Sequence, residues 1–281
     1  MTDLTLSPDD IATAVDAALK EDVGSGDATT RATIPADARL RGSFRARGPL
    51  TVSGLPVAAA VFERCGDGIT FEPVLADGAT AEAGDVLAHV EGPAEDVLTG
   101  ERTALNFLHL MSAIATETRR YVDAVEGTGC TILDTRKTLP GLRALSKYAV
   151  TCGGGTNHRM RLDDAILIKD NHIAVAGGIG EAVRRALAAD TGLTVQAECD
   201  TIEQIREALA AGAHSLLLDN MPPAMLRRAV EVVDGRVPLE ASGGVRLHTI
   251  HEIAATGVDY ASVGAITQYL PAIDIGLDLD G

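Results

Sequence analysis

Residues 130–172 gather basic side chains in an otherwise acidic chain. The full sequence holds 24 Lys and Arg against 40 Asp and Glu, which gives a formal net charge of −16. Within this window the balance is +3, and the basic residues are Arg136, Lys137, Arg143, Lys147, Arg159, Arg161 and Lys169. Clustered guanidinium and ammonium groups favour a small, multiply anionic ligand, because they pair with carboxylate and phosphate oxygens. A solvated basic face is the alternative; the flexible Gly153–Gly155 and the cations at the ends of apolar runs argue against it.

Strand-like apolar runs alternate with helical segments after residue 128, which predicts repeated βα units and a parallel sheet. The expected strands are 130–135, 165–169, 194–199, 215–219, 237–241 and 259–263, and the expected helices include 140–150, 177–190, 201–211, 222–234 and 246–256. Six units in series favour a barrel or an incomplete barrel. Because the carboxyl ends of such strands build the active site, we expect the polar residues at these ends to meet.

Small residues follow the last two expected strands. Ser242, Gly243 and Gly244 precede a helix, and Ser262 and Gly264 stand in a similar short run. Loops of this kind direct backbone N–H groups at a phosphate after the last strands of many barrels. We therefore expect a phosphate site here, with plain structural turns as the alternative.

Two carboxylates, Glu198 and Asp219, end consecutive expected strands. Their hard oxygens suit Mg²⁺, which keeps several waters and takes substrate phosphates as further ligands. We expect a hydrated magnesium ion held by Glu198 and Asp219 through water. Zinc is not expected, because His158 and His172 have no third soft ligand nearby in the sequence.

The first half of the chain predicts a separate α+β module. Short alternating apolar runs between 39 and 99, bounded by Gly and Pro, predict mostly antiparallel strands. Ser7 and Pro8 are typical of a helix N-terminus. The expected helices are 7–21, 55–65 and 95–126, the last with a break near Ser112 as the alternative.

Composition and charge argue against several classes of protein. We recognise no signal-peptide pattern and do not expect one, and no apolar run approaches the roughly 20 residues of a membrane span, so we expect a cytoplasmic protein without a membrane partner. The net charge argues against nucleic-acid binding. The four cysteines are widely spaced and are expected to be thiols. Many acids with 20 Arg and only 4 Lys suggest adaptation to high salt, where screening lowers self-repulsion.

Short motifs follow one another along the chain: EDVGSGDAT at 21–29, ERTALNFLHLMSAIAT at 101–116, DTRKTLPGLR at 134–143, KYAVTCGGGTNHRMRL at 147–162, LIKDNH at 167–172, ECD at 198–200, LLDNM at 217–221, EASGG at 240–244 and SVGA at 262–265. Together they resemble the quinolinate phosphoribosyltransferase family (nicotinate-nucleotide pyrophosphorylase, carboxylating). The resemblance spans essentially the full length. One departure is Ala113, where the family usually has Gly.

The resemblance implies an α/β protein with an N-terminal α/β sandwich and an incomplete parallel α/β barrel. We place the sandwich at 1–112, joined by the C-terminal tail 267–281, and the barrel at 113–266. Members of the family form homodimers, and assembly of dimers into a higher oligomer is left open. Its members are pentosyltransferases that join quinolinate to 5-phosphoribosyl 1-pyrophosphate in NAD biosynthesis. The products are nicotinate mononucleotide, pyrophosphate and CO₂, and the reaction needs Mg²⁺ and no organic cofactor.

Roles for individual residues also follow from the resemblance. Arg136, Arg159 and Lys169 match the cations that bind the quinolinate carboxylates. His158 stands beside them, and Arg102 matches an arginine that the partner subunit contributes. The catalytic residues are Lys137, which matches a lysine at the pyrophosphate end, and Glu198 and Asp219, which match the acids near the ribose and metal. Ser242, Gly243 and Gly264 match the phosphate loops. Gly244 and Ser262 are added to this set because they belong to the small-residue runs described above.

Three alternatives stay open at this point. One is a related phosphoribosyltransferase for another anionic base, although a monocarboxylate would leave surplus cations unpaired. Another is a non-catalytic quinolinate-binding protein, against which the intact Lys137, Glu198 and Asp219 argue. The third is a barrel aldolase that uses Lys169 as a Schiff base; the cations around Lys169 and the adjacent Asp170 weaken it.

Overall fold

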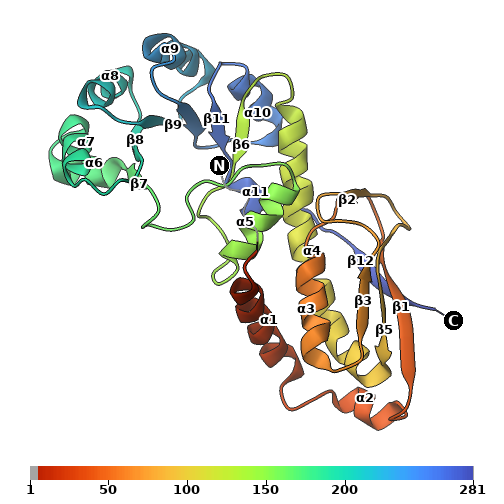
Figure 1. The fold of residues 1–281 in the computed structure, drawn as a ribbon. Coiled ribbons are helices and arrows are strands. Elements are labelled where there is room, and N and C mark those ends of the chain that lie inside the picture. Colours follow the sequence, from red (N-terminus) through yellow and green to blue (C-terminus); the bar gives the residue numbers. More distant parts are fainter. Residues whose placement is uncertain (1–5, 281) are drawn as a thin grey trace. The chain divides into compact units, whose positions relative to one another are not determined.

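The computed structural model describes residues 6–280, and the chain divides into two compact units (Figure 1). The first unit comprises Met1–Arg119, Thr138–Gly154 and Tyr269–Gly281, and the second comprises Arg120–Lys137 and Gly155–Gln268. Each unit is therefore assembled from segments that are distant in the sequence. The division expected at residues 112 and 113 stays a prediction.

A four-stranded sheet lies at the centre of the first unit. Its order is β12-β1-β5-β3, and all neighbours are antiparallel. The strands are β1 (Arg39–Ala46), β3 (Thr70–Pro73), β5 (Val86–Pro93) and β12 (Ile275–Leu279), and a separate antiparallel pair consists of β2 (Leu50–Thr51) and β4 (Thr80–Ala81). Phe44, Phe62 and Phe71 pack with ring centroids 5.7, 5.8 and 6.0 Å apart. These rings join the sheet to α3 (Leu55–Cys65).

The helices of the first unit begin and end where local signals place them. They are α1 (Pro8–Val23), α2 (Ala28–Thr33), α3, most of α4 (Ala94–Ala124) and α5 (Arg143–Cys152). At the start of α1 the Ser7 hydroxyl accepts a hydrogen bond from the backbone N of Asp10 at 3.0 Å. The helix ends at Gly24, whose φ of 57° few other residues tolerate. The predicted N-terminal helix is thus confirmed.

Helix α4 runs without interruption through Ser112, so a break at that position is wrong. The Ser112 hydroxyl donates to the carbonyl of Ser53 at 3.1 Å and accepts from the backbone N of Ser53 at 3.1 Å. Because its hydrogen bonds go to a neighbouring segment, the hydroxyl does not compete with the backbone of its own helix. Ser112 therefore ties α4 to the chain before α3.

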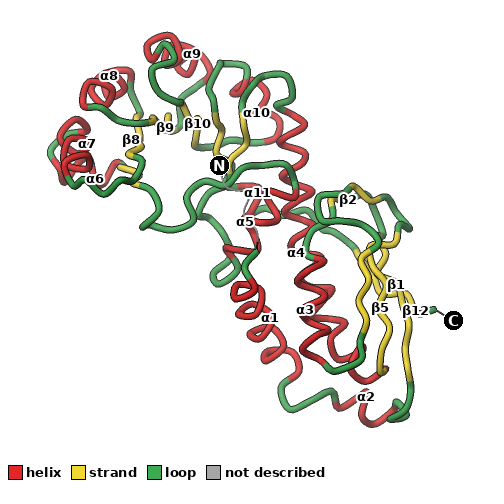
Figure 2. The backbone as a smooth tube through the Cα atoms, in the orientation of Figure 1, coloured by secondary structure: helices red, strands yellow, loops and turns green. Residues whose placement is uncertain are grey.

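The second unit is a six-stranded parallel sheet with the order β6-β11-β10-β9-β8-β7. The strands are β6 (Thr131–Leu133), β7 (Ile166–Ile168), β8 (Val195–Cys199), β9 (Ser215–Asp219), β10 (Leu239–Ser242) and β11 (Tyr260–Ser262). The helices are α6 (Asp170–Ala176), α7 (Ile179–Ala188), α8 (Ile202–Ala211), α9 (Pro223–Val233), α10 (Leu247–Ala254) and α11 (Ala265–Gln268). Figure 2 shows α7, α8 and α9 bordering the sheet.

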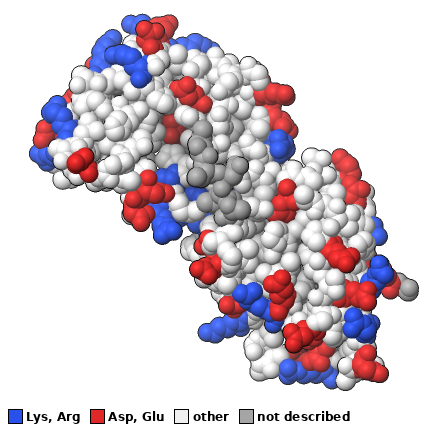
Figure 3. Space-filling view, viewed as in Figure 1, with Lys and Arg blue, Asp and Glu red and all other residues white. Residues whose placement is uncertain are grey.

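All six predicted strands are present, and within the described chain β6 and β7 remain the two edges of the sheet. The predicted α/β fold, with an antiparallel first part and an incomplete parallel barrel, is confirmed. Acidic and basic side chains are scattered over the face drawn in Figure 3. Among residues 6–280, no helix combines the length and the apolar character that crossing a membrane requires.

Candidate active site

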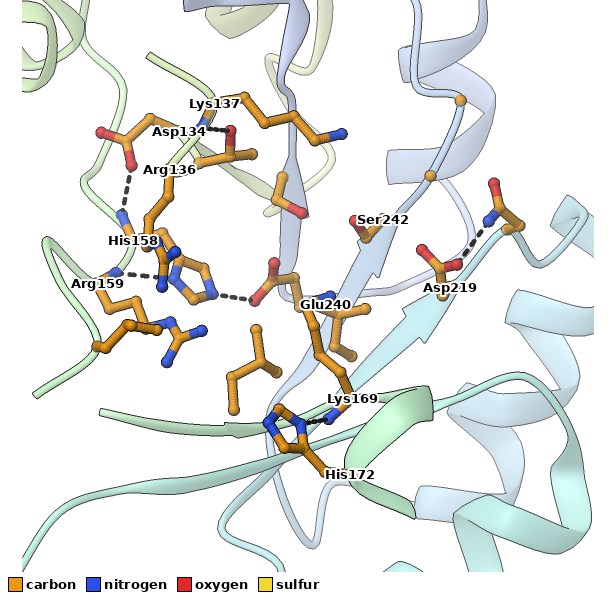
Figure 4. A pocket seen from close by; sticks show the side chains of 18 residues that line it. Asp134, Arg136, Lys137, His158, Arg159, Lys169, His172, Asp219, Glu240 and Ser242 are labelled. Atoms are coloured by element: carbon orange, nitrogen blue, oxygen red, sulfur yellow. Dashed lines mark hydrogen bonds and ion pairs between the residues drawn. The ribbon is translucent and has the colours of Figure 1, made fainter. Parts of the chain in front are cut away.

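A cavity of about 590 Å³ opens in the second unit at the carboxyl ends of its strands (Figure 4). Asp134 and Lys169 follow β6 and β7, while Asp219, Ser242 and Ser262 are the last residues of β9, β10 and β11. The lining residues that the sequence predicted are Arg136, Lys137, His158, Arg159, Lys169, Asp219, Ser242, Gly243, Gly244 and Ser262. Because the carboxyl ends of parallel strands meet at one edge of the sheet, most of the predicted residues lie together in this cavity.

Three nitrogen-bearing side chains, Arg136, His158 and Arg159, lie on one side of this cavity, opposite Asp219 and Ser242 (Figure 4). Burial lowers the pKa of the Arg159 guanidinium, and the nearby charge of Arg136 lowers it further. Two like charges held this close favour an anionic ligand, because a carboxylate between them relieves their repulsion.

The loop that carries His158 and Arg159 is fixed by a buried acid. Asp134 is fully buried and accepts hydrogen bonds from Nδ2 of Asn157 at 2.6 Å and from the backbone N of His158 at 2.9 Å. Farther along, Nη1 of Arg159 donates to the carbonyl of Ala165 at 3.0 Å. The carboxylate directly after β6 thus holds the cationic loop over the cavity.

Lys169 enters the cavity from the start of α6. Its backbone N donates to Nδ1 of His172 at 2.9 Å, which places the His172 ring beside it (Figure 4). Its ammonium group forms an ion pair with Glu198, a β8 residue whose side chain is only 10% exposed. Glu198 does not itself line the cavity, so it contributes through Lys169 in this arrangement.

The loop after β9 packs tightly against the loop after β10. Nδ2 of Asn220 donates to Oδ2 of Asp219 at 2.5 Å, and the backbone N of Asn220 donates to the carbonyl of Ser242 at 2.8 Å. A Cβ added to Gly243, whose φ is 86°, would lie 2.2 Å from Oδ1 of Asn220. Glycine is therefore required where this small-residue loop meets the end of β9.

Lys137 is held at the edge of the cavity by the segment after β11. The Thr267 hydroxyl donates to the carbonyl of Lys137 at 2.7 Å. Gly264 does not line the cavity, but a Cβ added there would lie 3.1 Å from Cδ of Lys137. Gly264 thus makes room for the lysine side chain.

Arg102 lies in the first unit and does not line the cavity described above. It is an exposed residue of α4 and borders a smaller cavity of about 340 Å³ together with Asp22, Asp27 and Thr99. Twelve of the thirteen predicted site residues therefore belong to the second unit, and Arg102 belongs to the first.

Several residues that line the cavity were not among the predicted site residues. These are Asp134, Thr135, Leu162, Leu167, His172, Leu217, Asn220 and Glu240. Glu240 is 3% exposed, its Oε2 lies 3.2 Å from Nε2 of His158, and it accepts a hydrogen bond from Nε2 of Gln196 at 2.8 Å. Asp134 and Asn220 each adjoin a strand end, which is the signal that could have found them, whereas Glu240 lies within a strand.

The acids near the cavity suit a hard cation better than a zinc ion. No cluster of three or more His, Cys, Asp or Glu side chains arranged for a metal occurs among residues 6–280. Asn220 engages one oxygen of Asp219, and Lys169 engages one oxygen of Glu198. Asp219 lines the cavity, so its second oxygen can accept a hydrogen bond from water bound to Mg²⁺, whereas Glu198 lies behind Lys169 and adds negative charge near that position.

Two family models match the chain: quinolinate phosphoribosyl transferase, N-terminal domain, over residues 27–112, and the C-terminal domain of the same family over residues 114–278. The chain belongs to the quinolinate phosphoribosyltransferase family. The family resemblance seen in the sequence is thereby confirmed.

Curated relatives and solved structures of this family agree along the whole chain. The nicotinate-nucleotide pyrophosphorylase (carboxylating) of Mycobacterium leprae is 46% identical over 268 residues, which cover 93% of this chain and 94% of the relative. A probable enzyme of the same name from Bacillus subtilis is 39% identical over 260 residues, with 92% and 90% covered. The structure of the Francisella tularensis nicotinate-nucleotide pyrophosphorylase superposes with a TM-score of 0.95 at 37% identity, and both chains are fully covered.

Proposed function

We propose that this chain catalyses phosphoribosyl transfer from 5-phosphoribosyl 1-pyrophosphate to quinolinate, with decarboxylation to nicotinate mononucleotide. The observation that supports this most directly is one cavity that combines Arg136, Arg159 and Lys169 with the small-residue loop after β10 and with Ser262 at the end of β11. The first set suits a dicarboxylate, and the second suits a phosphate. Family membership supports the same reaction.

Quinolinate binds on the cationic side of the cavity. The forks of Arg136 and Arg159 hold its carboxylates in the plane of the pyridine ring, and Lys169 adds a third positive charge. His158 lies beside them and lines the same side of the cavity. A monocarboxylate would leave part of this charge uncompensated, which favours the diacid.

The sugar pyrophosphate binds on the opposite side. Backbone N–H groups around Gly243 and Gly244, with the hydroxyls of Ser242 and Ser262, receive the 5-phosphate. Lys137 lies at the pyrophosphate end beside Gly264. These residues hold the anomeric carbon next to the quinolinate nitrogen, so that most of the catalytic effect is orientation.

At the sugar one bond forms and one breaks, and on the pyridine ring a carboxylate is then replaced by a proton. The ring nitrogen attacks the anomeric carbon while the carbon–oxygen bond to pyrophosphate breaks, and pyrophosphate leaves with the bonding electrons. Glu198 and Asp219 favour the positive charge that develops on the sugar, and Lys137 balances the leaving group. The nitrogen is now a pyridinium, which stabilises the carbanion formed as CO₂ departs; a proton from water completes the product.

Mg²⁺ belongs to this proposal, with Asp219 and Glu198 as the residues that would hold it through water. When bound, it supplies charge neutralisation for the pyrophosphate group. We also propose a homodimer in which Arg102 of each chain reaches the partner's quinolinate site. The exposure of Arg102 on α4, together with its absence from the lining of the second unit's cavity, supports this arrangement.

Product analysis tests the proposed reaction. The purified protein, incubated with quinolinate, 5-phosphoribosyl 1-pyrophosphate and Mg²⁺, should release CO₂ and pyrophosphate in equal amounts. A parallel assay with nicotinate should give little product, and turnover of nicotinate alone would favour the monocarboxylate alternative. Quinolinate binding without CO₂ release would indicate a binding protein, and borohydride trapping of Lys169 would indicate a Schiff base.

A further inference from the structure

Glu240 is a buried carboxylate in a cavity whose proposed ligands are anions. Its side chain comes from β10, is 3% exposed and lines the cavity between His158 and Gln196. Its Oε1 atom is buried and has no hydrogen-bond partner among the described residues. An anionic oxygen buried without a donor is costly, and such groups in native proteins usually have a functional reason. The contacts of Glu240 indicate which neighbouring side chain it orients.

The contacts of His158 place its proton on one nitrogen. Nδ1 lies 2.7 Å from the backbone N of Arg159, and a backbone N–H can only donate, so Nδ1 accepts and carries no proton. The proton of the neutral ring is then on Nε2, which faces Oε2 of Glu240 at 3.2 Å. A carboxylate is the acceptor that most favours this tautomer, because the hydrogen bond is charge-assisted.

The charge of Glu240 persists in spite of burial. Desolvation by burial raises the pKa of this carboxyl, but the hydrogen bond and charge of His158 and the hydrogen bond from Gln196 lower it more, so that its pKa falls below the usual range. The carboxylate therefore remains an acceptor for the His158 ring at neutral pH.

We propose that Glu240 is a positioning residue for quinolinate binding, acting through His158 on Arg159. A chain of hydrogen bonds runs from Gln196 to Glu240, then to the His158 ring, and from that ring to the backbone of Arg159. The guanidinium of Arg159 is held at its other end by the carbonyl of Ala165 at 3.0 Å. Both ends of Arg159 are thereby fixed before the ligand arrives, which lowers the entropic cost of binding.

This inference rests on the proposed function, because it takes quinolinate as the ligand of Arg159. The test compares Glu240→Gln, His158→Asn and the double variant with the wild-type chain. The variant Glu240→Gln keeps the size of the side chain and removes its charge. We expect the KM for quinolinate to rise at least about tenfold, with an unchanged KM for 5-phosphoribosyl 1-pyrophosphate. The double variant should be no worse than the more affected single variant, because both changes break the same chain.

The control is Glu207→Gln. Glu207 is another carboxylate of the second unit, and it accepts a hydrogen bond from the backbone N of Gly180 at 3.1 Å. This variant should leave both KM values unchanged. Equal losses for both substrates, or multiplicative losses in the double variant, would overturn the proposal. So would a change of less than twofold in Glu240→Gln.

A second measurement does not depend on turnover or on the stability of any variant at residue 240. The ¹⁵N spectrum of the ligand-free wild-type protein, with the His158 signals assigned by means of His158→Asn, should show a protonated Nε2 and an unprotonated Nδ1. The opposite tautomer would overturn the proposal even if the enzyme is active. Conversely, this tautomer in a protein that releases no CO₂ from quinolinate would leave the contact chain intact and refute the proposed function alone.

Discussion

Replacing Arg159 with Lys keeps a positive charge on the cationic loop but removes the planar fork. In the structure one guanidinium nitrogen of Arg159 binds the carbonyl of Ala165, and the side chain lines the cavity with its remaining donors. A lysine at this position has only three donors at the end of a flexible stem. The substitution therefore tests whether geometry, and not charge alone, binds quinolinate.

The expected loss follows from one charge-assisted hydrogen bond. Such a bond contributes about 1.5–3 kcal/mol, which corresponds to a roughly 10- to 150-fold rise in the KM for quinolinate. Burial and the charge of Arg136 lower the pKa of the arginine at position 159, and the same surroundings would lower the pKa of a lysine there. A lysine starts from a lower value than an arginine, so the Arg159→Lys defect should grow as the pH rises and the lysine loses its proton.

The assay follows CO₂ release with varied quinolinate and saturating 5-phosphoribosyl 1-pyrophosphate, across neutral and alkaline pH. The matched control is Arg161→Lys, because Arg161 belongs to the same loop but is exposed and does not line the cavity. A rise below about twofold in Arg159→Lys, or an equal rise in the control, would show that this guanidinium does not hold the substrate.

Three further predictions address the partner site, the loop after β10 and the thiols. If Arg102 acts in the partner's site, then Arg102→Ala and Arg159→Ala, each poorly active alone, should regain activity when unfolded and refolded together, since mixed dimers contain one complete site; no regain would place Arg102 in its own chain's site or outside any site. Gly243→Ala should lower stability by about 1–3 kcal/mol in urea unfolding and raise the KM for 5-phosphoribosyl 1-pyrophosphate, because its Cβ meets Asn220 and its φ is positive; wild-type values for both would contradict the packing described. Burial raises the pKa of Cys130 and of Cys199 to about 12, so neither thiol should react with iodoacetamide near neutral pH until the protein unfolds, and rapid labelling of the native protein, read by mass spectrometry, would contradict their burial.

The sequence was informative wherever a periodic pattern and a strand end coincided. All six parallel strands lie within one or two residues of their predicted positions, because continuous apolar runs bounded by polar residues are distinctive of buried parallel strands. The cations at those ends reached the same cavity for that reason. Helix α6 escaped prediction because none of its residues is buried, so it has no apolar stripe to recognise.

The acids that support the site were harder to recognise. Asp134 and Glu240 are buried carboxylates, yet in the sequence Asp134 only reduces the positive balance of the cationic region and Glu240 is one of many acids outside it. Their roles depend on which backbone N–H groups and which imidazole face them in the fold, and the sequence does not give those contacts. Glu198 is the opposite case, a residue that the sequence predicted for the site but whose side chain lies outside the cavity lining. It stands near a strand end as predicted, but its side chain meets Lys169 and does not line the cavity.

The pairing of β12 with β1 has a consequence for how the protein is made. The first strand of the amino-terminal sheet gains one of its two neighbours only from residues 275–279, at the far end of the polypeptide. While the chain is being synthesised, one edge of β1 stays unpaired until residues 275–279 have been made, and an exposed edge is where strands from other chains add.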